Sequence, residues 1–178
     1  ALATEKRTAR VYDRPVWCVA LRSWPSASTP DAEGTLLKTI RSAAEMQGAT
    51  LKFLAMQPAR DRALIEKLGV ARAEIMETEN LHPRGIMRLA GQSTLLIAMR
   101  LHALIFAAAQ GVPCVAISYD PKGKSLAQLI GAPVIENVSE SELAKLQAAT
   151  ASARPRSTLQ IEEMKTKARR NAQLAAGL

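Results

Sequence analysis

Aromatic side chains are scarce in this sequence of 178 residues, since Phe, Trp and Tyr together make up only 3% of it. That scarcity argues against a surface that stacks the bases of single-stranded nucleic acid on aromatic rings. No apolar stretch reaches the roughly 18 uncharged residues that a transmembrane helix needs. The first residues also lack the apolar segment of a signal peptide. We therefore expect a soluble, cytoplasmic protein.

Cysteine is nearly absent as well. Cys18 and Cys114 each lie inside an apolar run that predicts a buried strand. In the sheet proposed below another strand separates these two, so two spacings of roughly 4.8 Å each make a disulfide unfavourable. Buried free thiols suit a reducing cytosol.

Several familiar motifs are also missing. The sequence has no G-x-G-x-x-G after its first strand, no P-loop and no G-x-S-x-G nucleophile turn. No Cys and His set has the spacing of zinc ligands. We therefore expect no metal, no dinucleotide and no other cofactor.

The formal net charge of +8 is unevenly distributed. Residues 1–14 contribute +2 and residues 154–178 contribute +4, which leaves +2 for residues 15–153. A nucleic-acid site would place its positive charge on the folded core, so we expect no nucleic-acid partner. The pattern indicates a basic N-terminal linker (1–14), one folded domain (15–153) and a basic C-terminal helix (154–178).

Short apolar runs alternate with longer helical stretches along the chain. Strands are expected at residues 15–21, 50–56, 73–77, 94–98, 112–117 and 133–135, and helices at 31–47, 59–68, 83–90, 101–110, 124–130, 140–149 and 158–174. Alternating strands and helices require a parallel sheet with right-handed crossovers. We therefore predict an α/β fold: a Rossmann-like, doubly wound parallel sheet of about six strands in the order 3-2-1-4-5-6.

In such a sheet, ligands bind beyond the carboxyl ends of the strands, where the strand order reverses. The first strand ends in Arg22, and the fourth leads to Arg100 and His102. Because these strands would be neighbours, we expect the two guanidinium groups to hold an anion at the start of the following helix. We expect His102 to be neutral without a ligand and to gain a proton when a dianion binds.

Other polar residues follow the remaining strands, and each also has an ordinary structural explanation. Either arginine could pair with a nearby loop, and His102 could merely cap its helix. Asp61 could be a first-turn acid that favours the helix dipole, and Asp120 with Lys122 could only shape a turn around a proline. His82 is more simply an exposed loop residue.

Five segments of the chain carry a family resemblance. MRLHALIFAA at residues 99–108, GVP at 111–113 and SYDPK at 118–122 resemble the polysaccharide pyruvyl transferase family. LRSW at 21–24 is similar to the LRPW of that family, and FLAMQ at 53–57 with Asp61 is similar to its F-L-P-M-Q segment. Ser23, Ala55, Ala98 and Gly123 depart from the family pattern, but none of these differences removes a charged group.

The resemblance implies a reaction and an architecture. Members transfer the enolpyruvyl group of phosphoenolpyruvate to a sugar of a cell-wall or capsular polysaccharide precursor, which forms a pyruvate ketal. Their fold is similar to two-domain glycosyltransferases of the GT-B type, and this chain resembles only the C-terminal, donor-side half. The partners implied are phosphoenolpyruvate, a glycan acceptor, and an N-terminal domain of the same enzyme against which the basic C-terminal helix would pack. A lipid-linked acceptor would also imply peripheral contact with a membrane surface.

The resemblance also implies roles for individual residues. His102 and Arg100 are the expected catalytic residues. The residues expected to bind substrate are Arg22, Gln57, Asp61, Leu101, Tyr119, Asp120 and Lys122.

Two other functions remain open from the sequence. A GT-B type domain could bind a nucleotide sugar, in which case Glu77 or Asp120 could hold the ribose. A basic domain could instead dock on an acidic polymer or nucleic acid.

Overall fold

The structure is a computed structural model that describes residues 13–23, 31–118, 120–136, 143–154 and 158–175. Six parallel strands form one sheet in the order β3-β2-β1-β4-β5-β6. They are β1 (Val16–Ala20), β2 (Thr50–Leu54), β3 (Ile75–Met76), β4 (Leu95–Ala98), β5 (Cys114–Ile117) and β6 (Val134–Ile135). The predicted fold class and strand order are therefore confirmed.

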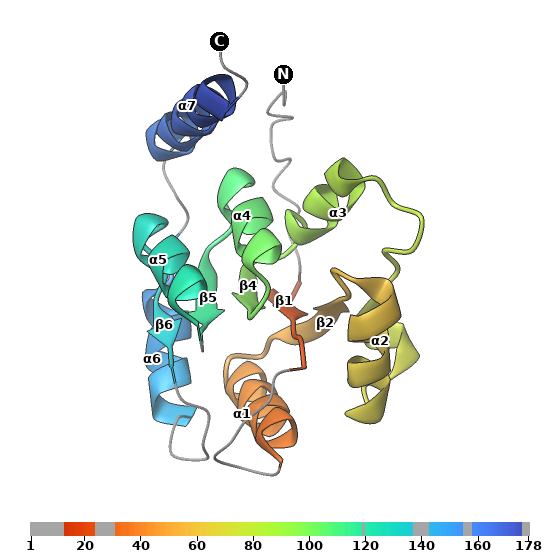
Figure 1. Ribbon diagram of the computed structural model, residues 1–178. Coiled ribbons are helices and arrows are strands. Elements are labelled where there is room, and N and C mark those ends of the chain that lie inside the picture. The colour runs from red at the N-terminus through yellow and green to blue at the C-terminus, as the bar shows by residue number, and fades with distance from the viewer. Residues whose placement is uncertain (1–12, 24–30, 119, 137–142, 155–157, 176–178) are drawn as a thin grey trace.

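Helices cover both faces of this sheet (Figure 1). One face carries α1 (Ala32–Met46), α2 (Pro58–Lys67) and α6 (Leu143–Ser152), and the other carries α3 (Pro83–Ala90), α4 (Leu101–Ala109) and α5 (Pro121–Leu129). The last helix, α7 (Thr158–Ala175), follows α6. No helix in the described parts of the chain combines the length and the apolar character needed to cross a membrane.

Alternate residues of each strand face opposite sides, and both sides are apolar. In β1, Trp17 and Val19 pack in the core beneath α1, whereas Cys18 and Ala20 pack in the core beneath α4. A strand that is buried on both faces needs a continuous apolar run, which is why these segments could be recognised in the sequence.

Alanines make up the surface between α4 and the sheet. Ala20 of β1, Ala98 of β4 and Ala116 of β5 are in register across three adjacent strands, and all three are fully buried. The face of α4 that packs on them carries three more buried alanines, Ala103, Ala107 and Ala108. Because so many of the side chains at this contact are alanines, helix and sheet can approach closely.

Two elements differ from the prediction. The expected strand at residues 73–77 is instead a short 3-10 helix, η1 (Arg72–Glu74), followed by the two residues of β3. The Glu74 side chain accepts a hydrogen bond from the Ala71 N–H (3.1 Å), which stabilises this turn over an extended conformation. Helix α5 begins earlier than expected, at Pro121, because Asp120 caps it and a proline is favoured in the first helical position.

The two cysteines lie in β1 and β5, with β4 between them, and both are buried thiols outside any disulfide. Burial raises the pKa of the Cys18 thiol to about 12. A thiol in that state is protonated and inert at neutral pH. Both cysteines are therefore small core residues.

Candidate active site

The predicted site lies at the carboxyl edge, by which we mean the sheet edge where the parallel strands end. Ala20 pairs with Ala98 in the register of β1 and β4, and the Met99 N–H continues the ladder to the Ala20 carbonyl oxygen (3.0 Å). Arg22 and Arg100 each follow two residues later, so their backbones leave adjacent strands at the same level. Both residues are half-buried. The structure thus brings the two predicted arginines together at the reversal of strand order.

Arg100 makes a specific contact at this edge. Its Nη2 forms an ion pair with Oδ1 of Asp61 in α2. The Asp61 side chain is 1% exposed and that of Arg100 is 15% exposed, so this pair is almost wholly shielded from solvent. Among the described residues, the Arg100 Nε is a buried nitrogen without a hydrogen-bond partner.

Asp61 is held from a second direction as well. Its Oδ2 accepts a hydrogen bond from the Gln57 N–H (2.9 Å), at the residue that precedes α2. Each carboxylate oxygen therefore has a partner within the protein. The exposed Gln57, also predicted to bind substrate, is the N-cap of α2 at the same edge.

His102 is the second residue of α4, and its side chain is exposed. The Ala103 N–H donates to the Arg100 carbonyl oxygen (3.0 Å), which closes the first turn. The N–H groups of Leu101 and His102 come before this bond and therefore point out of the helix end, where they favour an anion. The half-buried Leu101 contributes its backbone rather than its side chain.

The chain passes from β5 into α5 through a short, hydrogen-bonded turn. Asp120 accepts a hydrogen bond from the Gly123 N–H (2.8 Å) and so caps α5. The buried Ser118 hydroxyl donates to the Asp120 carbonyl oxygen (2.8 Å). A Cβ atom on Gly123 would lie 2.8 Å from this hydroxyl oxygen, so the glycine is required by the close approach. Lys122 is exposed, and Tyr119 lies outside the described residues.

Two other polar residues that the sequence analysis considered, His82 and Glu77, have partners within the protein. The exposed His82 is the N-cap of α3, where its Nδ1 accepts the Arg84 N–H (3.3 Å). Glu77 holds Arg62 (2.6 Å) and Arg72 (3.4 Å) through its two carboxylate oxygens.

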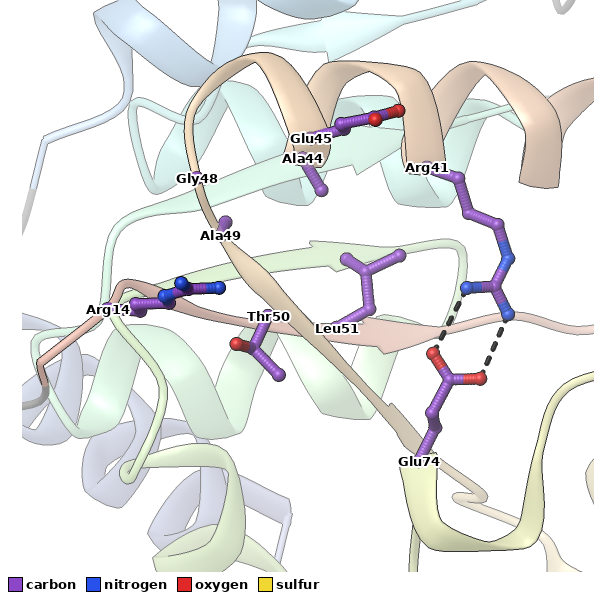
Figure 2. Close-up of a pocket in the computed structure, with 9 residues that line it drawn as sticks. All are labelled: Arg14, Arg41, Ala44, Glu45, Gly48, Ala49, Thr50, Leu51 and Glu74. Carbon is purple, nitrogen blue, oxygen red and sulfur yellow. Dashed lines mark hydrogen bonds and ion pairs between the residues drawn. The ribbon is translucent and has the colours of Figure 1, made fainter.

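An open cavity of about 480 Å³ lies elsewhere, near the start of β2 (Figure 2). It lies at the sheet edge opposite the carboxyl edge, since its lining includes Arg14 before β1 and Thr50 at the start of β2. Figure 2 shows the Arg41 guanidinium in direct contact with the Glu74 carboxylate in its lining, and two hydrogen bonds of 3.0 Å join them. This bidentate bond lowers the pKa of Glu74 and raises the pKa of Arg41. The pair joins α1 to η1, and we assign it a structural role.

The sequence alone did not reveal two features of the carboxyl edge. One is the ion pair between Asp61 and Arg100, which are 39 positions apart in the chain. The other is Ser118, which had no predicted role. A serine placed two residues before an Asp-Pro helix start was the available signal for the second feature.

The comparisons with known proteins can be set beside this geometry. A family model for polysaccharide pyruvyl transferase matches residues 15–121, which is more than half of the chain. The chain belongs to the polysaccharide pyruvyl transferase family. The match includes Arg22, Asp61, Arg100 and His102, and it ends just after Asp120. No curated protein matches the chain in sequence.

Solved structures resemble the fold at low sequence identity. An S. aureus MnaA structure with UDP has a TM-score of 0.54 at 11% identity, with 78% of this chain and 37% of that one covered. A structure described as a putative UDP-N-acetylglucosamine 2-epimerase from Listeria monocytogenes has a TM-score of 0.48 at 15% identity, with 76% of this chain and 36% of that one covered. The glycosyltransferase SnogD from Streptomyces nogalater has a TM-score of 0.44 at 18% identity, with 94% and 46% covered.

These likenesses concern the fold alone. This chain spans less than half the length of each of the three structures.

Proposed function

We propose that this domain binds phosphoenolpyruvate and contributes to transfer of its enolpyruvyl group to a sugar hydroxyl of a cell-wall or capsular polysaccharide precursor. The observation that carries the proposal is the register of β1 and β4, which sets Arg22 and Arg100 side by side next to the start of α4. Phosphoenolpyruvate carries a phosphate and a carboxylate, and guanidinium groups match both anions in a bidentate manner. The matched family supports this donor class.

The reaction requires protonation of the donor and departure of phosphate. A proton reaches the methylene carbon, which becomes a methyl group, and C2 becomes an oxocarbenium-like centre. One sugar hydroxyl adds to C2 and loses its proton, the bond from C2 to the phosphate oxygen breaks, and a second hydroxyl closes the ketal. The products are the pyruvate ketal and inorganic phosphate.

The residues at the carboxyl edge suit these steps. The exposed His102 can exchange protons with a ligand, as a general acid or base does. Arg22, Arg100 and the two N–H groups at the start of α4 favour the charge of the departing phosphate. Lys122 and Tyr119 are proposed as further donor contacts. The reaction as written needs no cofactor.

The partners follow from the same proposal. The acceptor sugar would be presented by an N-terminal domain, because this chain spans less than half of the two-domain-sized structures that it resembles. We place the reaction in the cytoplasm and the basic α7 against that second domain. If the acceptor is lipid-linked, the enzyme would meet it at the membrane surface.

Binding of a nucleotide sugar is the alternative that the experiment must separate. It would require a carboxylate to grip the ribose, and the two acids considered for that role already have partners: Glu77 with Arg62 and Arg72, and Asp120 with the Gly123 N–H. This observation favours phosphoenolpyruvate over a nucleotide sugar.

The test is a titration of the chain that is monitored by NMR. The ligands are phosphoenolpyruvate, a uridine diphosphate sugar and duplex DNA, each at two salt concentrations. We expect saturable shifts with phosphoenolpyruvate only. Arg22→Ala should raise the Kd about 10-fold or more, the usual effect of losing a charge-assisted hydrogen bond. Arg88→Ala is the matched control, since Arg88 is exposed in the last turn of α3. Binding of the sugar nucleotide in preference to phosphoenolpyruvate would reject the proposal.

A further inference from the structure

The ion pair between Asp61 and Arg100 joins two parts of the sheet that are not neighbours. Asp61 is in α2, which follows β2, whereas Arg100 follows β4, and β1 lies between those strands. Two strand spacings amount to roughly 9.6 Å. The Arg100 side chain therefore reaches past the end of β1 toward α2 instead of projecting into solvent.

The Asp61 carboxylate that binds the Arg100 guanidinium is itself held in one orientation. The Gln57 N–H binds Oδ2 of Asp61 at 2.9 Å, so the backbone at the start of α2 sets the orientation of the carboxylate. The side chain is only 1% exposed, so it cannot reach a ligand. Asp61 therefore acts on the reaction through the groups that it holds, and Arg100 is the charged one among them.

Arg100 in turn is the N-cap of α4, two residues before His102. Its carbonyl oxygen accepts the N–H groups of Ala103 (3.0 Å) and Leu104 (3.2 Å), which closes the first turn. An arginine held at its side chain by α2 and at its carbonyl by α4 ties the two helix starts together. The guanidinium plane is then set before a ligand arrives, which reduces the entropy lost on binding.

We infer that Asp61 is a positioning residue, which holds the Arg100 guanidinium across the end of β1 so that it faces the phosphate or carboxylate of the donor. The inference rests on the proposed function for the identity of the anion. It replaces direct substrate contact, the role predicted for Asp61 from the sequence, with an indirect one. The contact itself is a property of the free protein and can be tested without the donor.

The first test follows the side-chain Nε–H of Arg100 by NMR in the ligand-free chain. This group is buried in the structure, so its signal should exchange slowly with water. Asp61→Asn keeps the volume of the side chain but removes its charge and one of its two acceptor oxygens, so the Gln57 N–H and the guanidinium compete for the oxygen that remains and the pair is weakened. We expect exchange to accelerate by about 10-fold or more, as expected for a locally opened group. Unchanged exchange would overturn the inference whether or not the chain binds phosphoenolpyruvate.

The second test measures the Kd for phosphoenolpyruvate. Asp61→Asn should raise it about 10-fold, and in an Arg100→Ala background the same change should alter it by less than about twofold, because coupled residues are not additive. Glu74→Gln is the control, because it breaks a different ion pair, the half-buried one with Arg41 at the opposite edge of the sheet, and should leave the Kd unchanged. Equal effects of Asp61→Asn in both backgrounds would show that Asp61 does not act through Arg100.

Two further outcomes are decisive. If the native chain shows no affinity for phosphoenolpyruvate while the Nε–H exchange responds as expected, the proposed function fails and the positioning of Arg100 stands. If Asp61→Asn does not fold, Arg100→Lys serves in its place, since it keeps the charge and loses the planar fork. Native affinity and a native fold in Arg100→Lys would overturn the inference.

Discussion

The guanidinium of Arg41 binds the carboxylate of Glu74 through two parallel hydrogen bonds of 3.0 Å, and this pair fastens α1 to the 3-10 turn before β3. The bond lowers the pKa of Glu74 from its ordinary value of 4.5. Because the folded-state pKa is below the unfolded one, the stabilisation is complete above about pH 4.5 and is lost as the pH falls through the folded-state value.

We therefore expect the free energy of unfolding to fall on acidification below about pH 4.5, and Glu74→Gln to remove part of that fall. Urea denaturation of both proteins over a pH series measures the difference. A pH dependence that is identical in the two proteins would contradict this assignment.

Removal of the Asp61 carboxylate should destabilise the fold strongly. Asp61→Ala leaves the Arg100 charge shielded from solvent without its partner, and such a change typically costs about 3–5 kcal/mol. Urea denaturation at neutral pH measures the loss. Glu77→Ala breaks ion pairs of an exposed carboxylate and should cost about 1 kcal/mol or less. Similar losses for the two variants would mean that burial does not set the strength of the Asp61 pair.

Cys18 should resist alkylation in the folded protein. Its thiol is fully buried, and burial raises its pKa to about 12, so almost no thiolate exists at pH values near 8, where free thiols react. We expect mass spectrometry to find Cys18 unmodified after iodoacetamide treatment of the native chain and modified after treatment in urea. Rapid labelling without denaturant would show that β1 opens readily.

His102→Ala should reduce turnover of the enzyme that contains this chain. Loss of a general acid or base lowers the rate by at least about 100-fold, whereas the affinity for phosphoenolpyruvate should change less. A steady-state assay of phosphate release gives kcat and KM separately. His82→Ala is a matched control, since His82 is also exposed and lies at a helix start. Near-normal turnover of His102→Ala would exclude the acid–base role.

The strands and helices were predictable because the signals that mark them are local in sequence. Their alternation along the chain then predicts the strand order of a doubly wound sheet. Buried strands need continuous apolar runs, and Gly48 and Gly111, both with positive φ, mark where helices end. The predicted neighbours Arg22 and Arg100 follow directly from that order. The third strand was predicted to begin two residues too early, because the carboxylate of Glu74 favours a 3-10 turn before β3 through a hydrogen bond to the Ala71 N–H.

The partners of the site residues could not be read from the sequence. Asp61 has the same appearance, three residues into a helix after a proline, whether it binds a ligand, favours the helix dipole or pairs with a distant arginine. Which of these occurs depends on the reach of the Arg100 side chain over the end of β1, and that is a property of the packed sheet. The hydroxyl of Ser118 similarly acquires its role only when α5 brings Gly123 against it.

The buried alanines under α4 make the position of His102 sensitive to residues that never touch it. Ala98 is fully buried in the core that α4 shares with the sheet, so we expect a larger side chain at residue 98 to overpack this core and push the helix outward. Such a displacement would carry the imidazole away from the two arginines, which belong to the strand ends and would stay behind. We therefore expect the size of the side chain at residue 98, beneath α4, to be one source of natural variation in activity within this family.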